Sequence, residues 1–269
     1  MSWRLKRAAR VALKIVATVV DPLFGRLRGP RILVYHQVGV NFGREMEVST
    51  QTFTRQLDWM QDNGEIVSLE SAIERAAETG AHKLFVLTFD DGFADVYHNA
   101  FPLMKQRGIP FTLYLTTRPI ETGEPLDPRY PNAKPMTWDQ VNEMIGAGLV
   151  TIGAHTHTHP DLRDLVTDQI AEELDASNTI IEQRTGRRPK HFTYPWGWWA
   201  ESADHLVRER YDTATVGWTS PVMPLSDLAV LGRLPIQSSD EIVWFKRRVK
   251  TGLRLENMIR RRRSKYAGP

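Results

Sequence analysis

The sequence predicts an α/β fold with parallel strands. Short apolar runs that suit buried strands alternate along the chain with longer runs that suit helices, and this alternation indicates parallel β/α construction. The chain has 269 residues, of which 41% are hydrophobic, and α/β barrels of this size form a single domain. Polar residues follow two of the apolar runs, and barrel chemistry is found at the C-terminal ends of strands. We therefore expect a single α/β domain with parallel strands.

Caps and glycines mark the elements of the first half. A strand is expected after Pro30, and a helix capped around Ser49 carries apolar residues at near-helical spacing until Gly64 ends it. A short strand and a second helix, stopped at Gly80, precede the apolar run that leads into two aspartates. A further helix is closed by Gly108. The predicted strands here are 32–35, 66–69, 84–87 and 111–116, and the predicted helices are 50–63, 70–79 and 95–107.

The second half begins with residues 118–135, which are rich in proline and read as a long loop of the kind that shapes a substrate cleft. Thr137 then caps a helix that Gly148 ends, and a later long amphipathic helix stops at Gly186. The predicted helices of this half are 138–147, 164–184 and 202–210, and the predicted strands are 150–154, 191–194, 211–216 and 231–236.

Two adjacent carboxylates, Asp90 and Asp91, follow the strand predicted at 84–87. Side chains alternate along a strand, so consecutive aspartates point in different directions. One carboxylate can therefore face a metal ion while the other faces the reacting atom. Asp-Asp pairs also occur in turns and at helix N-caps, so the pair alone does not define a site.

The strand predicted at 150–154 ends in His155, His157 and His159, three of the eight histidines within five residues. Packing does not readily explain three imidazoles crowded beside a strand end. Imidazole and carboxylate together suit a divalent ion of the zinc class, with cobalt and nickel as alternatives. Two histidines and one aspartate would leave a position open for water, which is typical of a catalytic zinc site.

The run Thr88–Gly92, the residues His155, Thr156 and His159, and the later Tyr194–Gly197 resemble the first three motifs of the polysaccharide deacetylases, carbohydrate esterase family four. Order and spacing agree over roughly residues 31–237. The resemblance implies a distorted (β/α) barrel and removal of N-acetyl groups from an amino sugar.

The resemblance also implies a role for each matching residue. Asp91, His155 and His159 would bind the metal, with His157 as an alternative to His159. Asp90 would be the general base, and the backbone N–H of Trp196 would stabilise the oxyanion. The residues around Trp196 are expected to bind substrate; they are Tyr194, Pro195, Gly197 and Trp198. The indoles in this stretch could stack on sugar rings or pack in the core.

Two departures from the family pattern matter. Thr193 stands where the third motif usually has an Arg that orients the base, and no histidine follows Leu231 where the general acid is expected. The strand predicted at 32–35 ends in His36, which resembles the Tyr-His start of the exopolysaccharide and poly-N-acetylglucosamine deacetylase branch. That likeness implies that His36 is the general acid. Arg233 is our candidate for the missing Arg, as the partner of Asp90.

The two ends of the chain are strongly basic. Residues 1–31 hold eight Lys or Arg against one acid, and residues 243–269 hold ten against one. We expect a basic amphipathic segment at 1–29, a catalytic domain at 30–242 and a basic tail at 243–269. The apolar part of 11–20 is too short to span a bilayer and suits a helix lying on an anionic membrane surface; a signal peptide and solvated, partly disordered ends are the alternatives.

The predicted function is metal-dependent N-deacetylation of an N-acetylated polysaccharide or lipid-linked glycan. The alternatives are a deformylase of a lipid-linked amino sugar and a catalytically impaired glycan-binding protein on the same fold. A nucleic-acid partner is not expected, because the barrel supplies no reading module. We expect peripheral membrane association on the cytoplasmic face, with a periplasmic or secreted protein as the alternative. The absence of cysteine excludes disulfides but does not fix the compartment.

Overall fold

The computed structural model describes residues 3–20, 25–218, 223, 226–253 and 255–256. The helices are α1 (Trp3–Val20), α2 (Thr50–Asn63), α3 (Leu69–Glu74), α4 (Phe101–Gln106), α5 (Thr117–Thr122), α6 (Trp138–Gly146), α7 (Thr167–Thr185), α8 (Glu201–Arg210) and α9 (Ile242–Thr251). The strands are β1 (Arg31–Tyr35), β2 (Gln37–Val38), β3 (Glu47–Val48), β4 (Glu65–Ile66), β5 (Leu84–Phe89), β6 (Phe111–Leu115), β7 (Val150–Ala154), β8 (His191–Thr193), β9 (Thr213–Val216) and β10 (Leu231–Pro235).

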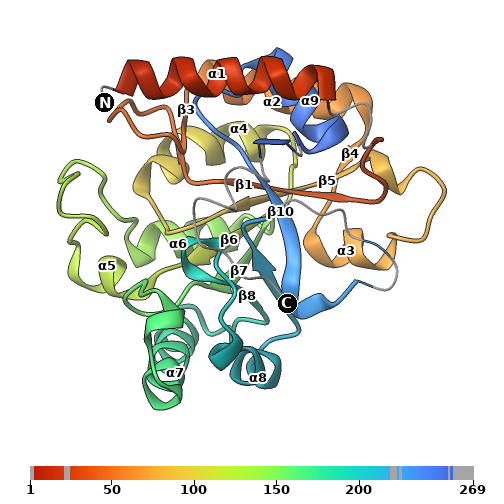
Figure 1. The fold of residues 1–269 in the computed structure, drawn as a ribbon. Helices are drawn as coiled ribbons and strands as arrows, with labels where there is room; N and C mark the ends of the chain where they lie inside the picture. Colours follow the sequence, from red (N-terminus) through yellow and green to blue (C-terminus); the bar gives the residue numbers. More distant parts are fainter. Residues whose placement is uncertain (1–2, 21–24, 219–222, 224–225, 254, 257–269) are drawn as a thin grey trace.

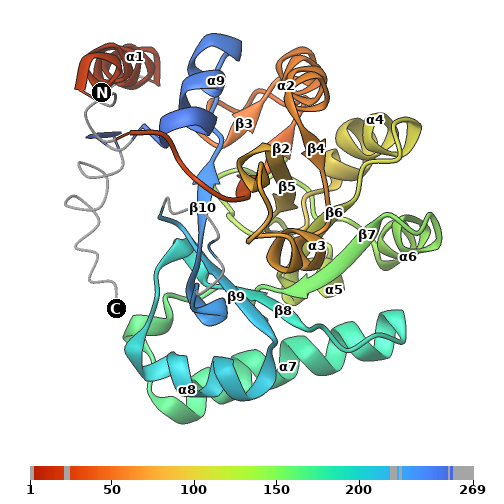
Figure 2. The same cartoon turned by 90° about the vertical axis from the view of Figure 1, so that its right-hand side faces the viewer.

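Seven parallel strands close into a barrel within the described part of the chain, which confirms the predicted fold class. Their order is β1-β10-β9-β8-β7-β6-β5, and the ring closes because β1 pairs with both β10 and β5. The short β4 adds to the start of β5, while β2 and β3 form a separate pair. Helices surround the strands (Figures 1 and 2). Parallel pairing brings the C-terminal ends of all seven strands to one end of the barrel.

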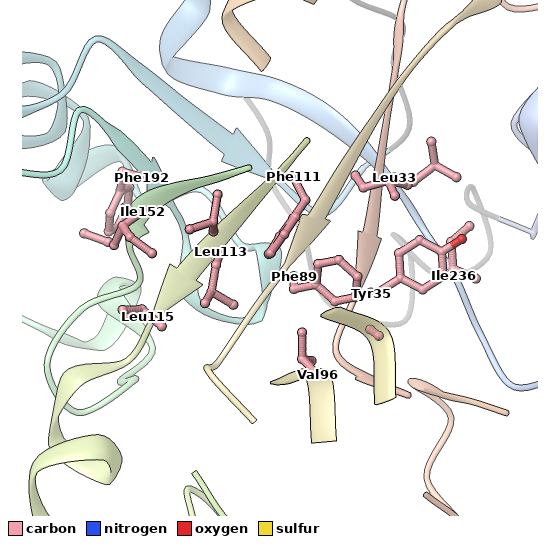
Figure 3. Close-up of a cluster of buried hydrophobic side chains, with 14 of the residues drawn as sticks. Leu33, Tyr35, Phe89, Val96, Phe111, Leu113, Leu115, Ile152, Phe192 and Ile236 are labelled. Atoms are coloured by element: carbon pink, nitrogen blue, oxygen red, sulfur yellow. The ribbon is translucent and has the colours of Figure 1, made fainter. Parts of the chain in front are cut away.

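The layer between strands and helices is the main hydrophobic core (Figure 3). Tyr35, Phe53, Phe89 and Phe111 form an aromatic cluster in which neighbouring ring centroids lie 5.2–6.0 Å apart. Every residue of β1, β5 and β6 is buried, as expected for parallel strands that are covered on both faces. The strand ends are therefore held by packing on both sides.

Three polar side chains meet inside the barrel. Arg233 on β10 donates to the hydroxyl of Thr88 on β5 at 3.2 Å, and its guanidinium lies 5.6 Å from the ring centroid of Tyr114 on β6. These strands are not neighbours of β10, so the three side chains meet inside the ring. A Cβ added at Gly153 on β7 would lie 2.4 Å from the Tyr114 ring, which explains the glycine at that position.

Local details differ from the sequence prediction in three places. The stretch predicted as a loop at 118–135 begins inside helix α5. The strand predicted at 66–69 is limited to β4, because Ser68 already caps α3 through the N–H of Ser71. That helix ends at Glu74 rather than at residue 79. The boundaries predicted for the terminal segments stay predictions, and most of the basic tail lies outside the described residues.

Candidate active site

Every second side chain of a barrel strand faces the interior. This alternation places three polar side chains at the C-terminal mouth of the barrel. Asp90 comes two residues after Thr88, which faces the interior. His36 comes two residues after Val34, the register partner of Thr88. His155 comes two residues after Gly153, which faces Tyr114. Sequence positions that are far apart are therefore brought together by closure of the ring.

Asp91 leaves this alternation. Its φ of 74° lies in the left-handed region, which is costly for a residue other than glycine. His159, Thr156 and Trp196 share this feature, with φ of 62°, 65° and 61°. Backbone strain is thus concentrated around one point at the barrel mouth, as is common where function fixes a side chain. The two aspartates take different partners, as predicted.

Asp91, His155 and His159 form a cluster in which one ligand atom from each lies within 4.8 Å of the others. Asp91 Oδ1 lies 3.4 Å from His155 Nε2 and 3.6 Å from His159 Nε2, and it is buried without a hydrogen-bond partner. Two atoms each about 2.1 Å from a tetrahedral zinc-class ion would be about 3.4 Å apart. The donor types, the spacing and the unpartnered oxygen all fit a divalent metal site.

The hydrogen bonds around the histidines leave the ligand atoms available. His155 Nδ1 donates to the carbonyl of Thr193 at 2.7 Å, which leaves Nε2, the atom nearest Asp91, free to act as a metal ligand. The backbone N–H of His159 donates to Thr156 Oγ1 at 3.1 Å and fixes the turn between the two histidines. Burial, and then the neighbouring His155, lower the pKa of His159 to about 4, so this imidazole is neutral at pH 7.

His157, the alternative ligand, points elsewhere. Its Nδ1 lies 2.9 Å from the hydroxyl of Thr117, and its backbone N–H donates to Glu173 at 2.9 Å. It is not part of the cluster found among the described residues. The geometry therefore favours His159 over His157.

Asp90 and Arg233 form a buried, two-pronged ion pair, with both N–H···O distances at 2.7 Å. The two residues are 143 positions apart in sequence, and Arg233 is only 2% exposed. Burial raises the pKa of Asp90, but the charge and hydrogen bonds of Arg233 outweigh it and hold the pKa below its ordinary value. The structure thus places against Asp90 the arginine that the third motif lacks.

His36 completes the group. Its Nδ1 is buried without a hydrogen-bond partner. Burial lowers the pKa of His36, while the nearby carboxylates of Asp91 and Asp90 act against that shift. His36 directly follows β1, which pairs with β5, so it lies at the same end of the barrel as Asp90 and Asp91. The predicted base, acid and metal ligands therefore converge on one end of the barrel.

The third motif forms the rim. Trp196 is 57% exposed, and its ring centroid lies 5.1 Å from that of His159 and 5.8 Å from that of Trp198. Arg163 covers the Trp198 ring at 4.0 Å. A Cβ on Gly197 would lie 2.5 Å from a backbone atom of Gly217, so the motif glycine permits close approach of two loops. In contrast, Tyr194 and Pro195 are buried beneath this rim.

Sequence reasoning missed two contributors. The carbonyl of Thr193 orients His155, although only the side chain at this position had been considered. Tyr114 lies under the Arg233 guanidinium and fills the barrel interior next to Gly153. Tyr114 could have been noticed as a residue with a polar group inside an apolar strand. Which face of β6 points into the barrel, however, is decided only by closure of the barrel.

A parallel barrel with an acid and two imidazoles at its strand ends defines the class of protein: its layout suits metal-assisted hydrolysis. Comparison with known proteins gives the family. Residues 77–211 match the family model described as polysaccharide deacetylase, and the chain belongs to this family. The matched segment contains both aspartates, the histidine cluster and the third motif. In contrast, His36 and Arg233 lie outside it.

Individual relatives agree with this assignment. The chain is 28% identical over 142 residues to the poly-beta-1,6-N-acetyl-D-glucosamine N-deacetylase of Staphylococcus epidermidis, covering 52% of this chain and 46% of that protein. It is 26% identical over 169 residues to Bacillus subtilis YxkH, whose name assigns it provisionally to the polysaccharide deacetylases, covering 62% of this chain and 56% of that protein. The chain thus spans about half the length of these curated relatives.

Solved structures share the fold. IcaB from Ammonifex degensii superposes with a TM-score of 0.71 at 24% identity, covering 86% of this chain and 97% of that one. The Streptococcus pyogenes deacetylase PplD, solved in complex with acetate, gives a TM-score of 0.70 at 24% identity, covering 82% and 97%.

Proposed function

We propose that this protein is a metal-dependent hydrolase that removes N-acetyl groups from an amino sugar in a polysaccharide or a lipid-linked glycan. The observation that carries the proposal is the buried, unpartnered Oδ1 of Asp91 facing two imidazole nitrogens at 3.4 and 3.6 Å. Family membership and the named activity of the S. epidermidis relative support the reaction type.

Asp91, His155 and His159 would hold the ion, with zinc as the first choice and cobalt or nickel as alternatives. Such an ion supplies Lewis-acid chemistry, because it acidifies water and polarises a carbonyl group. The oxygen donor and two nitrogen donors suit all three metals. The choice among them rests on metal analysis of the purified protein.

The remaining chemistry falls to side chains of this chain. Asp90 accepts the proton of the attacking water, and Arg233 holds the carboxylate ionised and correctly oriented. The water oxygen bonds to the acetamide carbon, the C–N bond breaks, and the amine nitrogen takes a proton from His36. Acetate and the free amino sugar are the products. Burial lowers the pKa of His36 and opposes the protonated form that this step needs, and the neighbouring carboxylates of Asp91 and Asp90 offset only part of that effect.

Substrate contacts would come from the rim. The backbone N–H of Trp196 would stabilise the oxyanion, and the exposed face of its indole would stack on the apolar face of a sugar ring. Tyr194, Pro195 and Gly197 hold this loop in place beside the ligand cluster. Since Trp198 lies against Trp196, it extends the same aromatic surface.

The arrangement supports an enzyme over a catalytically impaired glycan-binding protein. That alternative was based on the missing motif arginine and the missing late histidine. Arg233 contacts the base, and His36 lies within the influence of both aspartates. Deformylation of a lipid-linked amino sugar uses the same residues and differs only in the acyl group.

The test is an acyl-release assay with metal analysis. The purified chain is loaded with zinc, cobalt or nickel and incubated with N-acetylglucosamine oligomers and with N-acetylated and N-formylated lipid-linked amino sugars. We expect acetate release that requires a bound metal and is absent from Asp90→Asn. Saccharide binding without release of acetate or formate from any substrate would establish the binding protein instead.

A further inference from the structure

Helix α1 is attached to the barrel in an unusual orientation. Among the residues whose side chains are described, Lys14 is fully buried, while Ile15 and Val16 are 55% and 53% exposed. Helices on soluble proteins normally bury their apolar face and expose their charges. Helix α1 therefore buries one of its cations against the barrel and leaves two large apolar side chains exposed.

Ion pairs account for the inward face. Lys14 Nζ donates to Asp240 at 2.6 Å and to Ser239 at 2.6 Å, and Asp240 also accepts from Arg248 Nε at 2.8 Å. Arg10 forms an ion pair with Glu45. A buried cation is tolerated only with such partners, so these ion pairs hold this face of α1 against the barrel.

The outward face is apolar throughout its described length. The exposed residues of this part of the helix, which we call the outer face of α1, are Ala8, Ala9, Ala12, Ile15 and Val16. Exposed apolar surface of this kind marks an interaction site when it is contiguous. Helix α9 lies beside α1 (Figures 1 and 2), and its residue Val243 is 58% exposed.

The charges around this face select its partner. Helix α1 contains no acidic residue, and its first two turns include Arg4, Lys6 and Arg7. Four further cations are exposed on α9 and on the segment beside it, which is held there by a hydrogen bond from the Leu27 N–H to the Lys250 carbonyl; they are Arg26, Arg28, Arg247 and Lys250. Apolar side chains flanked by cations are complementary to an anionic lipid surface.

The attachment points also place the helix relative to the active site. Glu45 lies in the segment between β2 and β3, just beyond the C-terminal end of β1, and Asp240 lies just beyond that of β10. The first half of α1 is therefore at the same end of the barrel as the catalytic cluster. No described helix is long and apolar enough to cross a bilayer.

We propose that the outer face of α1 docks on an anionic membrane surface and sets the mouth of the barrel beside the lipid headgroups. This orientation favours a substrate glycan that is held at a membrane, and this statement about the substrate rests on the proposed function. Lipid docking itself does not depend on the proposed function, because it can be measured without any substrate.

The experiment is cosedimentation of the full chain with vesicles of phosphatidylcholine alone or with 30% phosphatidylglycerol (roughly the anionic content that gives a strong surface potential). We expect binding to the anionic vesicles that weakens with added salt. The double variant Ile15→Ser/Val16→Ser should lose about tenfold or more in affinity, because two partly buried apolar side chains are removed from the interface. The variant Arg247→Ser/Lys250→Ser should lose about fivefold per cation.

The matched control is Val166→Ser, because Val166 is 65% exposed but precedes helix α7, away from α1. It should bind vesicles as the unaltered chain does. Equal losses in the control and the α1 variant, or no loss in the α1 variant, would overturn the proposal. Light scattering tests whether the outer face of α1 binds a second copy of the chain instead. The proposal is also overturned if the chain binds no vesicles and forms a dimer that Ile15→Ser/Val16→Ser dissociates. Acyl release measured on soluble oligomers in parallel distinguishes failure of docking from failure of the enzyme.

Discussion

Replacing Arg233 with methionine should both destabilise the fold and slow the reaction. The guanidinium makes two 2.7 Å hydrogen bonds to Asp90, and the two side chains are 2% and 4% exposed. Methionine has similar length but no charge, so the carboxylate of Asp90 would remain buried without its partner. Breaking a buried pair on one side costs about 3–5 kcal/mol. For a chain of this size the melting temperature should fall by about 6–20 °C.

Arg233→Lys separates charge from geometry. Lysine keeps the positive charge but offers a point donor in place of the planar fork, so one of the two charge-assisted bonds is lost at a cost of about 1.5–3 kcal/mol. If the fork matters mainly by orienting Asp90 in the transition state, turnover should fall by about 10- to 100-fold. Metal content should stay unchanged, because the guanidinium of Arg233 donates its hydrogen bonds to Thr88 and Asp90 and not to the ligand cluster.

Arg210→Met is the matched control. Arg210 makes the same two-pronged contact with Asp175, at 2.8 and 2.9 Å, but the Asp175 side chain is 52% exposed. Water can solvate that carboxylate, so the loss should not exceed about 1 kcal/mol. Thermal melts, acyl release and metal analysis are measured on all three variants. Equal melting temperatures for Arg233→Met and Arg210→Met, together with unchanged turnover in Arg233→Lys, would refute the reasoning.

Four other substitutions test the remaining assignments. Asp91→Ala should abolish metal binding, and a normal metal content would contradict its role as a ligand. Asp90→Asn should keep the metal and lose about 100-fold or more in turnover, as expected when a general base is removed. His36→Ala should also keep the metal and lose activity; an intact rate would place the acid elsewhere. Gly197→Ala should lower stability by at least about 1–2 kcal/mol, because a Cβ would lie 2.5 Å from a neighbouring backbone atom at a φ of 69°; an unchanged thermal melt would show that the loops can separate.

The local parts of the site could be predicted because they depend on short stretches of chain. Asp90 and Asp91 directly follow β5, so a few residues of chain are enough to place both carboxylates at the end of that strand, although the direction of Asp91 comes from its left-handed backbone and not from strand alternation. His155 and His159 are separated by one turn, so a short stretch of chain is also enough to bring both to one ligand cluster. The helix caps at Ser49 and Thr137 were also readable, since capping is a contact between residues three positions apart.

Other features could not be read from a local pattern. Arg233 was a candidate only because the third motif lacked an arginine, and no local feature links it to Asp90 across 143 residues. The proline-rich stretch after residue 117 starts as helix α5, because proline is accepted in the first turn of a helix. The inward orientation of Lys14 depends on Asp240, a partner 226 positions away.

The sequence by itself determined the alternating strands and helices, the aspartate pair and the histidine cluster, because side-chain periodicity and ligand chemistry act over a few residues. Only the tertiary structure decided that His36 and Arg233 reach the same mouth, since closing the ring between β1, β5 and β10 brings these ends together. It also decided which face of α1 meets solvent. Ion pairing with Asp240 turned Lys14 inward and left Ile15 and Val16 exposed, a choice that helical periodicity alone leaves open.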